Sequence, residues 1–267
     1  RLFQLHINTP IGNKAVQCVV NNHVSNIIII ILISLCNLFK YFSANYLMHS
    51  LWYLFINMGF IFLCYPFANN YLYVKYDKFN NYDVERKNYI TKNFIKSYVL
   101  FYLSIVTIPF IPMILFSFGK INKCIHFIGF LYTTGDTVAL IKNMNMSYST
   151  KIHHTLTTSL GIINIFINWE NANDVSRLMA VYMILSCYSY DVNYCLSMRF
   201  LTNEYEQKIM KKRAFIIYMT CCAINWSIHG SYLIYNITNL NLSLISYYFA
   251  IFFIVYDDIV LLKWLRN

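Results

Sequence analysis

The sequence predicts an all-α fold, a polytopic transmembrane helical bundle of about eight spans. Of the 267 residues, 58% are hydrophobic and only 12% are charged, whereas a soluble domain carries about 25% charged residues. Apolar runs approaching the ~20 residues that a helix needs to cross a bilayer recur along the chain. The chain therefore lacks the polar surface of a soluble globule and is expected to be an integral, multi-pass membrane protein.

The apolar runs give the spans in chain order. The first run is short but dense ("IIIIILISL"), and the third contains "TIPFIP", in which Pro109 and Pro112 should kink the helix or end it early. The fourth and fifth are the least hydrophobic, so seven spans are the alternative. The longest loops are expected at 68–93 and 199–213. The predicted spans are residues 24–39, 46–67, 94–118, 124–142, 152–168, 175–198, 214–236 and 242–265.

The distribution of basic residues supports eight spans with both termini in the cytosol. With this topology, four of the 21 lysines and arginines lie on the outer side, and the other 17, Lys92 and Lys96 among them, lie on the cytosolic side. The positive-inside rule expects such an excess, and a missed span would scramble it. A role as topology signals is enough to explain these charges, although each one near an anionic leaflet adds up to about 1 kcal/mol of attraction.

Charge and cysteine patterns argue against several other classes of function. The basic residues fall between apolar runs rather than on a polar module with stacking aromatics, so nucleic acid is not an expected partner. The eight cysteines contain no Cys-x-x-Cys pair, which argues against a metal knuckle. Adjacent histidines do not point to one helix face as His-x-x-x-His does, so no metal and no bound cofactor are predicted. Membrane lipids are the expected partners, and a homodimer is left open.

Ionisable residues inside the apolar runs are the candidates for function, because an Asp at the centre of a span costs about 3 kcal/mol on insertion. Asp136 lies in "FLYTTGDTVALIK" and Asp191 in "LSCYSYDVNYCLSMRF", while His153 and His154 open the fifth span. In the eight-span topology all of them lie toward the cytosolic side. This shared depth predicts one site formed by Asp136, Asp191 and one of the two histidines.

The fifth span carries two polar faces. His154, Thr158 and Gly161 recur at i, i+4 and i+7 and share the first face. The neighbouring face is formed by His153, Thr157, Leu160 and Asn164. Successive residues project about 100° apart, so only one histidine points into a given cavity. The expected cavity opens toward the cytosolic leaflet and is lined by Asp136, His154, Thr158, Asp191 and Asn193.

Other polar groups in the spans have plain structural explanations. Asp257 and Asp258 lie near the end of the last span and are expected to reach interfacial water. His229 falls in the outer half of the seventh span and is expected to form an interhelical hydrogen bond. Interfacial placement is also the alternative explanation for the two histidines of the fifth span.

Gly135-Asp136, followed by His153-His154 with Thr157 in an apolar helix, resembles the TLC family. This family unites ceramide synthases, translocating-chain-associated proteins and related lipid-handling membrane proteins. The resemblance covers roughly residues 46–265. It implies an N-terminal segment with the first transmembrane helix over 1–45, a TLC-like domain over 46–267, and residence in an endomembrane such as the endoplasmic reticulum.

The resemblance leaves three functions open. Ceramide synthases carry His-Asp and a further Asp at their second motif, whereas this chain has Tyr190-Asp191 and then Asn193, closer to the non-synthase members. The first function is lipid binding that influences membrane lipid composition, with Thr157, Thr158 and Asn193 against the lipid. The second is an acyl-CoA-dependent lipid N-acyltransferase, with acyl-CoA as co-substrate. The third is a transporter or trafficking adaptor. The implied catalytic residues of the second are His153, His154, Asp136 and Asp191.

Overall fold

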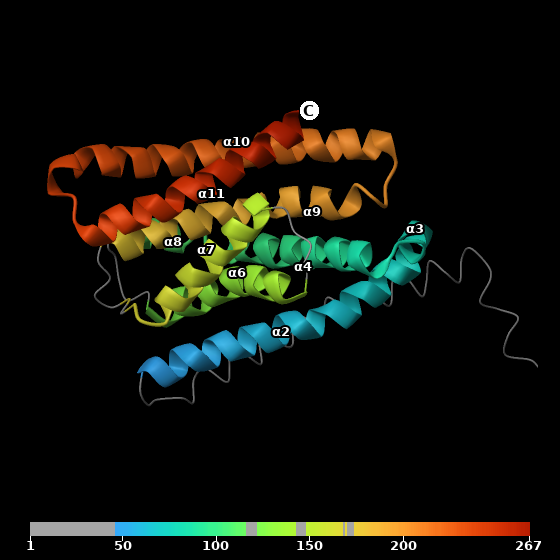
Figure 1. The fold of residues 1–267 in the computed structure, drawn as a ribbon, viewed down its shortest axis with the longest axis horizontal. Helices are drawn as coiled ribbons and strands as arrows, with labels where there is room; N and C mark the ends of the chain where they lie inside the picture. The colour runs from blue at the N-terminus through green and yellow to red at the C-terminus, as the bar shows by residue number, and fades with distance from the viewer. Residues whose placement is uncertain (1–45, 116–121, 143–147, 168, 170–173) are drawn as a thin grey trace, which may run out of the picture. The chain divides into compact units, whose positions relative to one another are not determined.

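The computed structural model describes residues 46–115, 122–142, 148–167, 169 and 174–267, and these residues form helices joined by turns (Figure 1). No β-strand occurs among them, so the all-α prediction is confirmed for the described part of the chain. By contacts the chain divides into residues 1–49 and 50–267. The helices are α2 (Tyr46–Lys75), α3 (Asp77–Asn80), α4 (Val84–Val106), α5 (Phe110–Leu115), α6 (Asn122–Lys142), α7 (Tyr148–Asn164), α8 (Asp174–Ser186), α9 (Tyr190–Met198), α10 (Glu204–Tyr235) and α11 (Leu242–Arg266), with 3₁₀ turns at Cys187–Ser189 and Ile237–Asn239.

Three helices of the described part are long and apolar enough to cross a membrane. They are the segments Leu51–Lys75 of α2, Cys124–Lys142 of α6 and Leu242–Arg266 of α11. They coincide with the second, fourth and eighth predicted spans, which supports a membrane protein. The first predicted span, 24–39, lies outside the described residues. The other predicted spans contain helices that are shorter or more polar.

The third predicted span differs from the structure at both ends. Its helix, α4, begins at Val84, because the carboxylate of Asp83 accepts a hydrogen bond from the backbone N–H of Arg86 at 2.7 Å and caps the first turn. It ends at Val106, and α5 begins only after Pro109. A proline restricts the residue before it to extended conformations and removes a backbone donor, so the predicted early end is confirmed.

Two predicted long loops are mostly helical. Residues 68–93 contain the end of α2, all of α3 and the start of α4. Residues 199–213 contain the first ten residues of α10, which starts at Glu204 behind a capping box made by Asn203 and Glu206. The predicted sixth span is also not one continuous helix, because the 3₁₀ turn at Cys187–Ser189 separates α8 from α9.

Helices α6 and α7 pack closely through small residues. A Cβ atom added to Gly161 of α7 would lie 2.5 Å from Oγ1 of Thr133 on α6, and one added to Gly129 of α6 would lie 2.9 Å from Nδ2 of Asn164 on α7. Small residues allow helix backbones to approach in this way within membranes. This approach fixes how the polar residues of the two helices meet.

Replacing Gly161 with alanine is therefore expected to destabilise the protein by about 1–3 kcal/mol, because the new methyl group on α7 collides with Thr133 and pushes α6 away from α7. Gly230 of α10 is the matched control, since nothing lies within 4 Å of a Cβ atom there. Its replacement by alanine should leave stability unchanged or raise it by up to about 1 kcal/mol through helix propensity. Thermal unfolding in detergent measures both, and equal effects would contradict the close packing.

Candidate functional site

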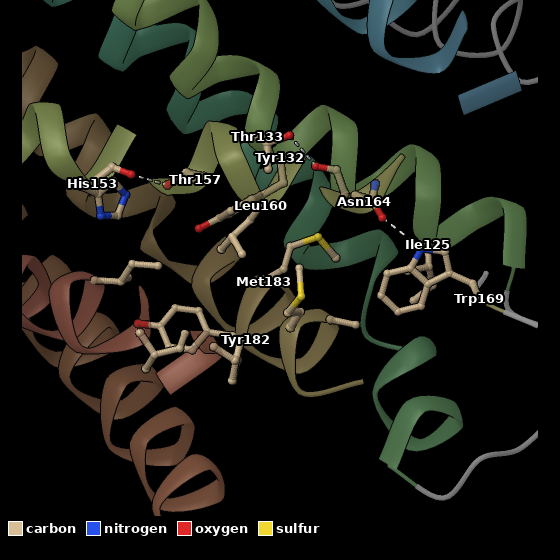
Figure 2. Close-up of a pocket in the computed structure, with 16 residues that line it drawn as sticks. Ile125, Tyr132, Thr133, His153, Thr157, Leu160, Asn164, Trp169, Tyr182 and Met183 are labelled. Carbon is tan, nitrogen blue, oxygen red and sulfur yellow. Dashed lines mark hydrogen bonds between the residues drawn. The ribbon is translucent and has the colours of Figure 1, made fainter. Parts of the chain in front are cut away.

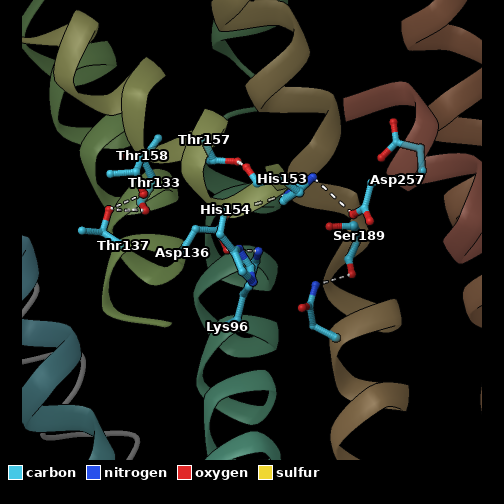
Figure 3. Close-up of polar contacts among 12 residues, drawn as sticks. Lys96, Thr133, Asp136, Thr137, His153, His154, Thr157, Thr158, Ser189 and Asp257 are labelled. Carbon is cyan, nitrogen blue, oxygen red and sulfur yellow. Dashed lines mark hydrogen bonds and ion pairs between the residues drawn. The ribbon is translucent and has the colours of Figure 1, made fainter. Parts of the chain in front are cut away.

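The packing of α6 on α7 brings Asp136 against both histidines (Figure 3). Asp136 is completely buried, and its Oδ1 lies 2.7 Å from Nδ1 of His154. Its Oδ2 lies 3.9 Å from Nε2 of His153. The sequence predicted that Asp136 and a histidine meet, and the structure brings Asp136 together with both members of the pair.

Lys96 of α4 is the fourth member of this cluster. Its ammonium group forms a hydrogen-bonded ion pair with Oδ1 of Asp136, and its side chain is 14% exposed. From the sequence Lys96 was counted among the cytosolic charges, and its pairing with a buried carboxylate was not expected; α4 carries its side chain into the interior of the bundle. The available signal was its position two residues inside the predicted span 94–118, where a lysine needs a partner.

Asp257 of α11 adds a second carboxylate. Its Oδ2 lies 3.3 Å from Nδ1 of His153, so that His153 stands between the carboxylates of Asp136 and Asp257 (Figure 3). Asp257 and Asp258 are 8% and 6% exposed, which corrects the expectation that both reach interfacial water. Asp258 points elsewhere and accepts hydrogen bonds from the hydroxyls of Tyr182 and Tyr218, each at 2.6 Å.

The two histidines of the cluster differ in their contacts. His153 contacts both carboxylates, whereas His154 contacts one. Three buried atoms of the cluster lack an aligned hydrogen bond: Oδ2 of Asp136 and Nδ1 of each histidine. Both nitrogens nevertheless face a carboxylate, Nδ1 of His154 at 2.7 Å from Asp136 and Nδ1 of His153 at 3.3 Å from Asp257.

A metal ion is the other occupant that this geometry allows. Ligand atoms from Asp136, His153 and His154 lie within 4.8 Å of one another, although the two histidines are adjacent in sequence. Tertiary packing thus achieves what their spacing on one helix does not. The ammonium of Lys96 already neutralises the Asp136 carboxylate and would repel a second cation there. This repulsion disfavours a metal ion beside Lys96.

A largely apolar cavity runs along α7 and ends at His153 (Figure 2). The space between the side chains that line it, together with the open solvent at the mouth, amounts to about 610 Å³. The α7 residues that line it are His153, Thr157, Leu160 and Asn164, the second of the two predicted polar faces. Helices α6, α8 and α11 supply the opposite walls with mainly apolar side chains, among them Ile125, Met179, Met183, Ile251 and Ile254.

The face that was expected to line the cavity instead packs on α6. Thr158 shares a hydrogen bond of 3.1 Å with Thr137, and Gly161 abuts Thr133. His154 points to Asp136 on the same side. The face of α7 that lines this cavity is therefore the neighbour of the expected one. It contains His153 and Thr157 rather than His154 and Thr158.

The remaining candidates lie outside the cluster. Asp191 forms an ion pair of 2.7 Å with Arg213, and the side-chain amide of Asn193 donates to the carbonyl of Ser189 at 3.1 Å. The structure does not bring either residue to the cavity. His229 contacts the hydroxyl of Tyr247 at 2.9 Å and the carbonyl of Leu178 at 3.3 Å, so its predicted interhelical role is confirmed.

The site thus combines an ion-paired histidine cluster with an adjoining apolar cavity. Four helices supply its charged groups: α4, α6, α7 and α11. No family model, no curated protein and no solved structure matches the chain. The resemblance to the TLC family therefore stays a prediction from the residues Asp136, His153, His154 and Thr157.

Proposed function

We propose that this protein is a multi-pass membrane protein that binds the acyl chain of a lipid and thereby influences membrane lipid composition. The observation that carries this proposal is the cavity along α7, which is apolar over most of its wall and polar at the His153 end. Ligand sites commonly combine an apolar wall with a few polar groups that fix orientation. An acyl chain with a polar head matches this division.

The length of the cavity supports the same ligand. From His153 to Asn164 the wall follows twelve residues of α7, whose eleven steps span roughly 16 Å at 1.5 Å per residue. One leaflet of hydrocarbon is about 15 Å thick, half of the ~30 Å core. An acyl chain bound in the cavity would therefore extend over about the same depth as the acyl chain of a lipid in the adjacent leaflet.

The membrane topology of this proposal has eight spans, with both termini in the cytosol of an endomembrane such as the endoplasmic reticulum. The excess of basic residues on one side supports it. In this orientation the His153 end of the cavity faces the cytosolic leaflet. The headgroup of a bound lipid would then lie near His153 and its acyl chain would point toward Trp169 at the far end.

Filling the cavity tests the proposal. Replacing Leu160, which lines the cavity, with tryptophan should lower the affinity for a fluorescent fatty-acyl lipid by roughly tenfold or more, because an indole takes the volume of several methylene groups of the chain. Ile163 lies one turn further along α7 and is 48% exposed on its outer face. The matched variant Ile163→Trp should bind the lipid as the unmodified protein does.

Binding is measured by titration of the labelled lipid into purified protein in detergent. Lipid binding that is equally strong in both tryptophan variants would remove the cavity as the binding site. Equal losses in both would point to a general effect of the substitution on α7, and would contradict the proposal as well.

The second candidate function is acyl transfer from acyl-CoA to a lipid amine, and the position of His153 favours it. This ring lies at the end of the cavity and contacts two carboxylates. In such a reaction the amine nitrogen attacks the thioester carbonyl, the imidazole accepts the amine proton, and the proton leaves with the CoA thiol. Asp136 and Asp257 would orient the ring and stabilise its charged form.

A further inference from the structure

Cationic and aromatic side chains alternate in a row where four helices end or begin. The guanidinium of Arg86 lies 4.5 Å from the ring centre of Phe200, and that of Arg199 lies 4.6 Å from the same ring. Arg199 is also 5.2 Å from the Trp264 ring, and the ammonium of Lys211 lies 4.6 Å from that ring. We call these five residues the cation–aromatic row. They come from the start of α4, the end of α9, the early part of α10 and the last turn of α11.

Neighbouring tyrosines hold this row in place. The hydroxyl of Tyr82 donates to the backbone carbonyl of Phe200 at 2.9 Å, and Arg199 donates to the hydroxyl of Tyr89 at 3.3 Å. Both tyrosine rings meet the Phe200 ring edge to face. The arrangement therefore has little side-chain freedom left to lose when a ligand binds.

The three cations of the row have no acidic partner among the described residues. The ion pairs of that part of the chain involve Lys96, Arg213 and the two histidines of α7. In addition, Nε of Arg199 is buried and makes no hydrogen bond. A buried guanidinium donor without an acceptor is costly, so the row is electrostatically incomplete.

We infer that the cation–aromatic row binds the phosphate of an anionic phospholipid headgroup. Arginine presents a planar fork of donors that matches phosphate oxygens, and the row carries two guanidinium groups, those of Arg86 and Arg199. Basic pockets between transmembrane helices on the cytosolic side are a known type of headgroup site. The inference is independent of the cavity along α7, since none of the five residues lines it.

The location of the row favours a lipid over a soluble phosphate. Trp264 lies in the last turn of α11, which is one of the three helices that are apolar enough to cross a membrane. Tryptophan and tyrosine concentrate at the membrane–water interface, at the depth of the headgroups. The phosphate of a phospholipid already lies at this depth, whereas a soluble phosphate has to bind from the aqueous solution.

Charge removal gives the first test, with fluorescent phosphatidic acid as the probe and the purified full chain in phosphatidylcholine nanodiscs. The triple variant Arg86→Gln/Arg199→Gln/Lys211→Gln should bind the probe roughly 10- to 100-fold more weakly, as expected from the loss of three basic groups near the membrane surface. Circular dichroism and size-exclusion profiles matching those of the unmodified protein show that the variant is folded.

A matched variant separates this site from diffuse attraction. Lys78, Lys208 and Lys212 are exposed, lie in or near the same helix ends and do not belong to the row. Their triple replacement by glutamine removes the same charge and should change the affinity by less than about threefold. Equal losses in the two triple variants would overturn the inference, because they would show attraction without a site.

Two further measurements keep the inference testable if the charge variant does not fold. The variant Phe200→Leu/Trp264→Leu keeps all charges and should still lose affinity for phosphatidic acid, because the rings no longer position the cations. Unchanged affinity would overturn a built site. Unlabelled phosphatidic acid should displace the probe, while CoA and inorganic phosphate should not at matched concentration. Displacement by either soluble compound would assign the row to soluble phosphates and overturn the lipid.

Discussion

Replacing Asp136 with asparagine is expected to destabilise the protein by about 3–5 kcal/mol. The carboxylate is completely buried and pairs with Lys96 while contacting both histidines. Its loss leaves an ammonium group in the interior without a counter-charge, and uncompensated buried charges carry the largest penalties of single substitutions. Thermal and chemical unfolding in detergent would show a large loss of stability.

A double-mutant cycle identifies Lys96 as the cause of that loss. Lys96→Met and Asp136→Leu each break the pair and should destabilise the protein, whereas the double variant Lys96→Met/Asp136→Leu should recover much of the stability, because an apolar pair of similar volume has no charge to bury. Asp77→Asn is the control, since Asp77 is exposed and outside every described ion pair. It should change stability by no more than about 0.5 kcal/mol.

Two results would contradict this account of the cluster. A loss below about 1 kcal/mol for Asp136→Asn would mean that Lys96 finds water or another acceptor once the carboxylate is gone. A double variant as unstable as the sum of the single ones would mean that the two side chains act independently. Either result would show that the ion pair between Lys96 and Asp136 does not stabilise the site.

The sequence could predict the centre of the site because its members lie on two consecutive helices. Asp136 lies on α6, and His153 and His154 lie on α7, the next helix along the chain. Short connections place consecutive helices side by side. Lys96 and Asp257 were missed for the opposite reason. They lie on α4 and α11, and their approach depends on the packing order of the whole bundle, which hydropathy does not encode.

The helix limits show a similar division between local and tertiary causes. Pro109 ends α4 by its own geometry, so the sequence was a sufficient guide there. The capping box of Asn203 and Glu206 is also visible in the sequence. The first turns of α10 are polar, however, so a search for apolar runs placed the start of this helix later. The choice between the two faces of α7 had no local signal. It was decided by the close approach of Gly161 to Thr133, which turns His154 to α6 and His153 to the cavity.

Replacing His153 with alanine separates the two candidate functions. If the protein transfers acyl groups, this variant should lower turnover by roughly 10²- to 10⁴-fold, because the ring at the end of the cavity no longer accepts the amine proton. Lipid affinity should change by only a few-fold, since the apolar wall from Leu160 onward is intact. Lys151→Ala, two residues earlier on α7 and exposed, should leave both quantities unchanged.

The measurement is acyl transfer from a series of acyl-CoA thioesters to lipid amines, made beside lipid binding on the same preparations. Asp257→Asn should give a smaller loss of turnover than His153→Ala, because it removes one of the two carboxylates that orient the ring and leaves the ring itself in place. Turnover that survives in His153→Ala would exclude this histidine as the base. Lipid binding without transfer in the unmodified protein, for every thioester and amine in the series, would favour lipid handling without catalysis. The cluster would then serve to hold the polar head of the lipid at the His153 end of the cavity.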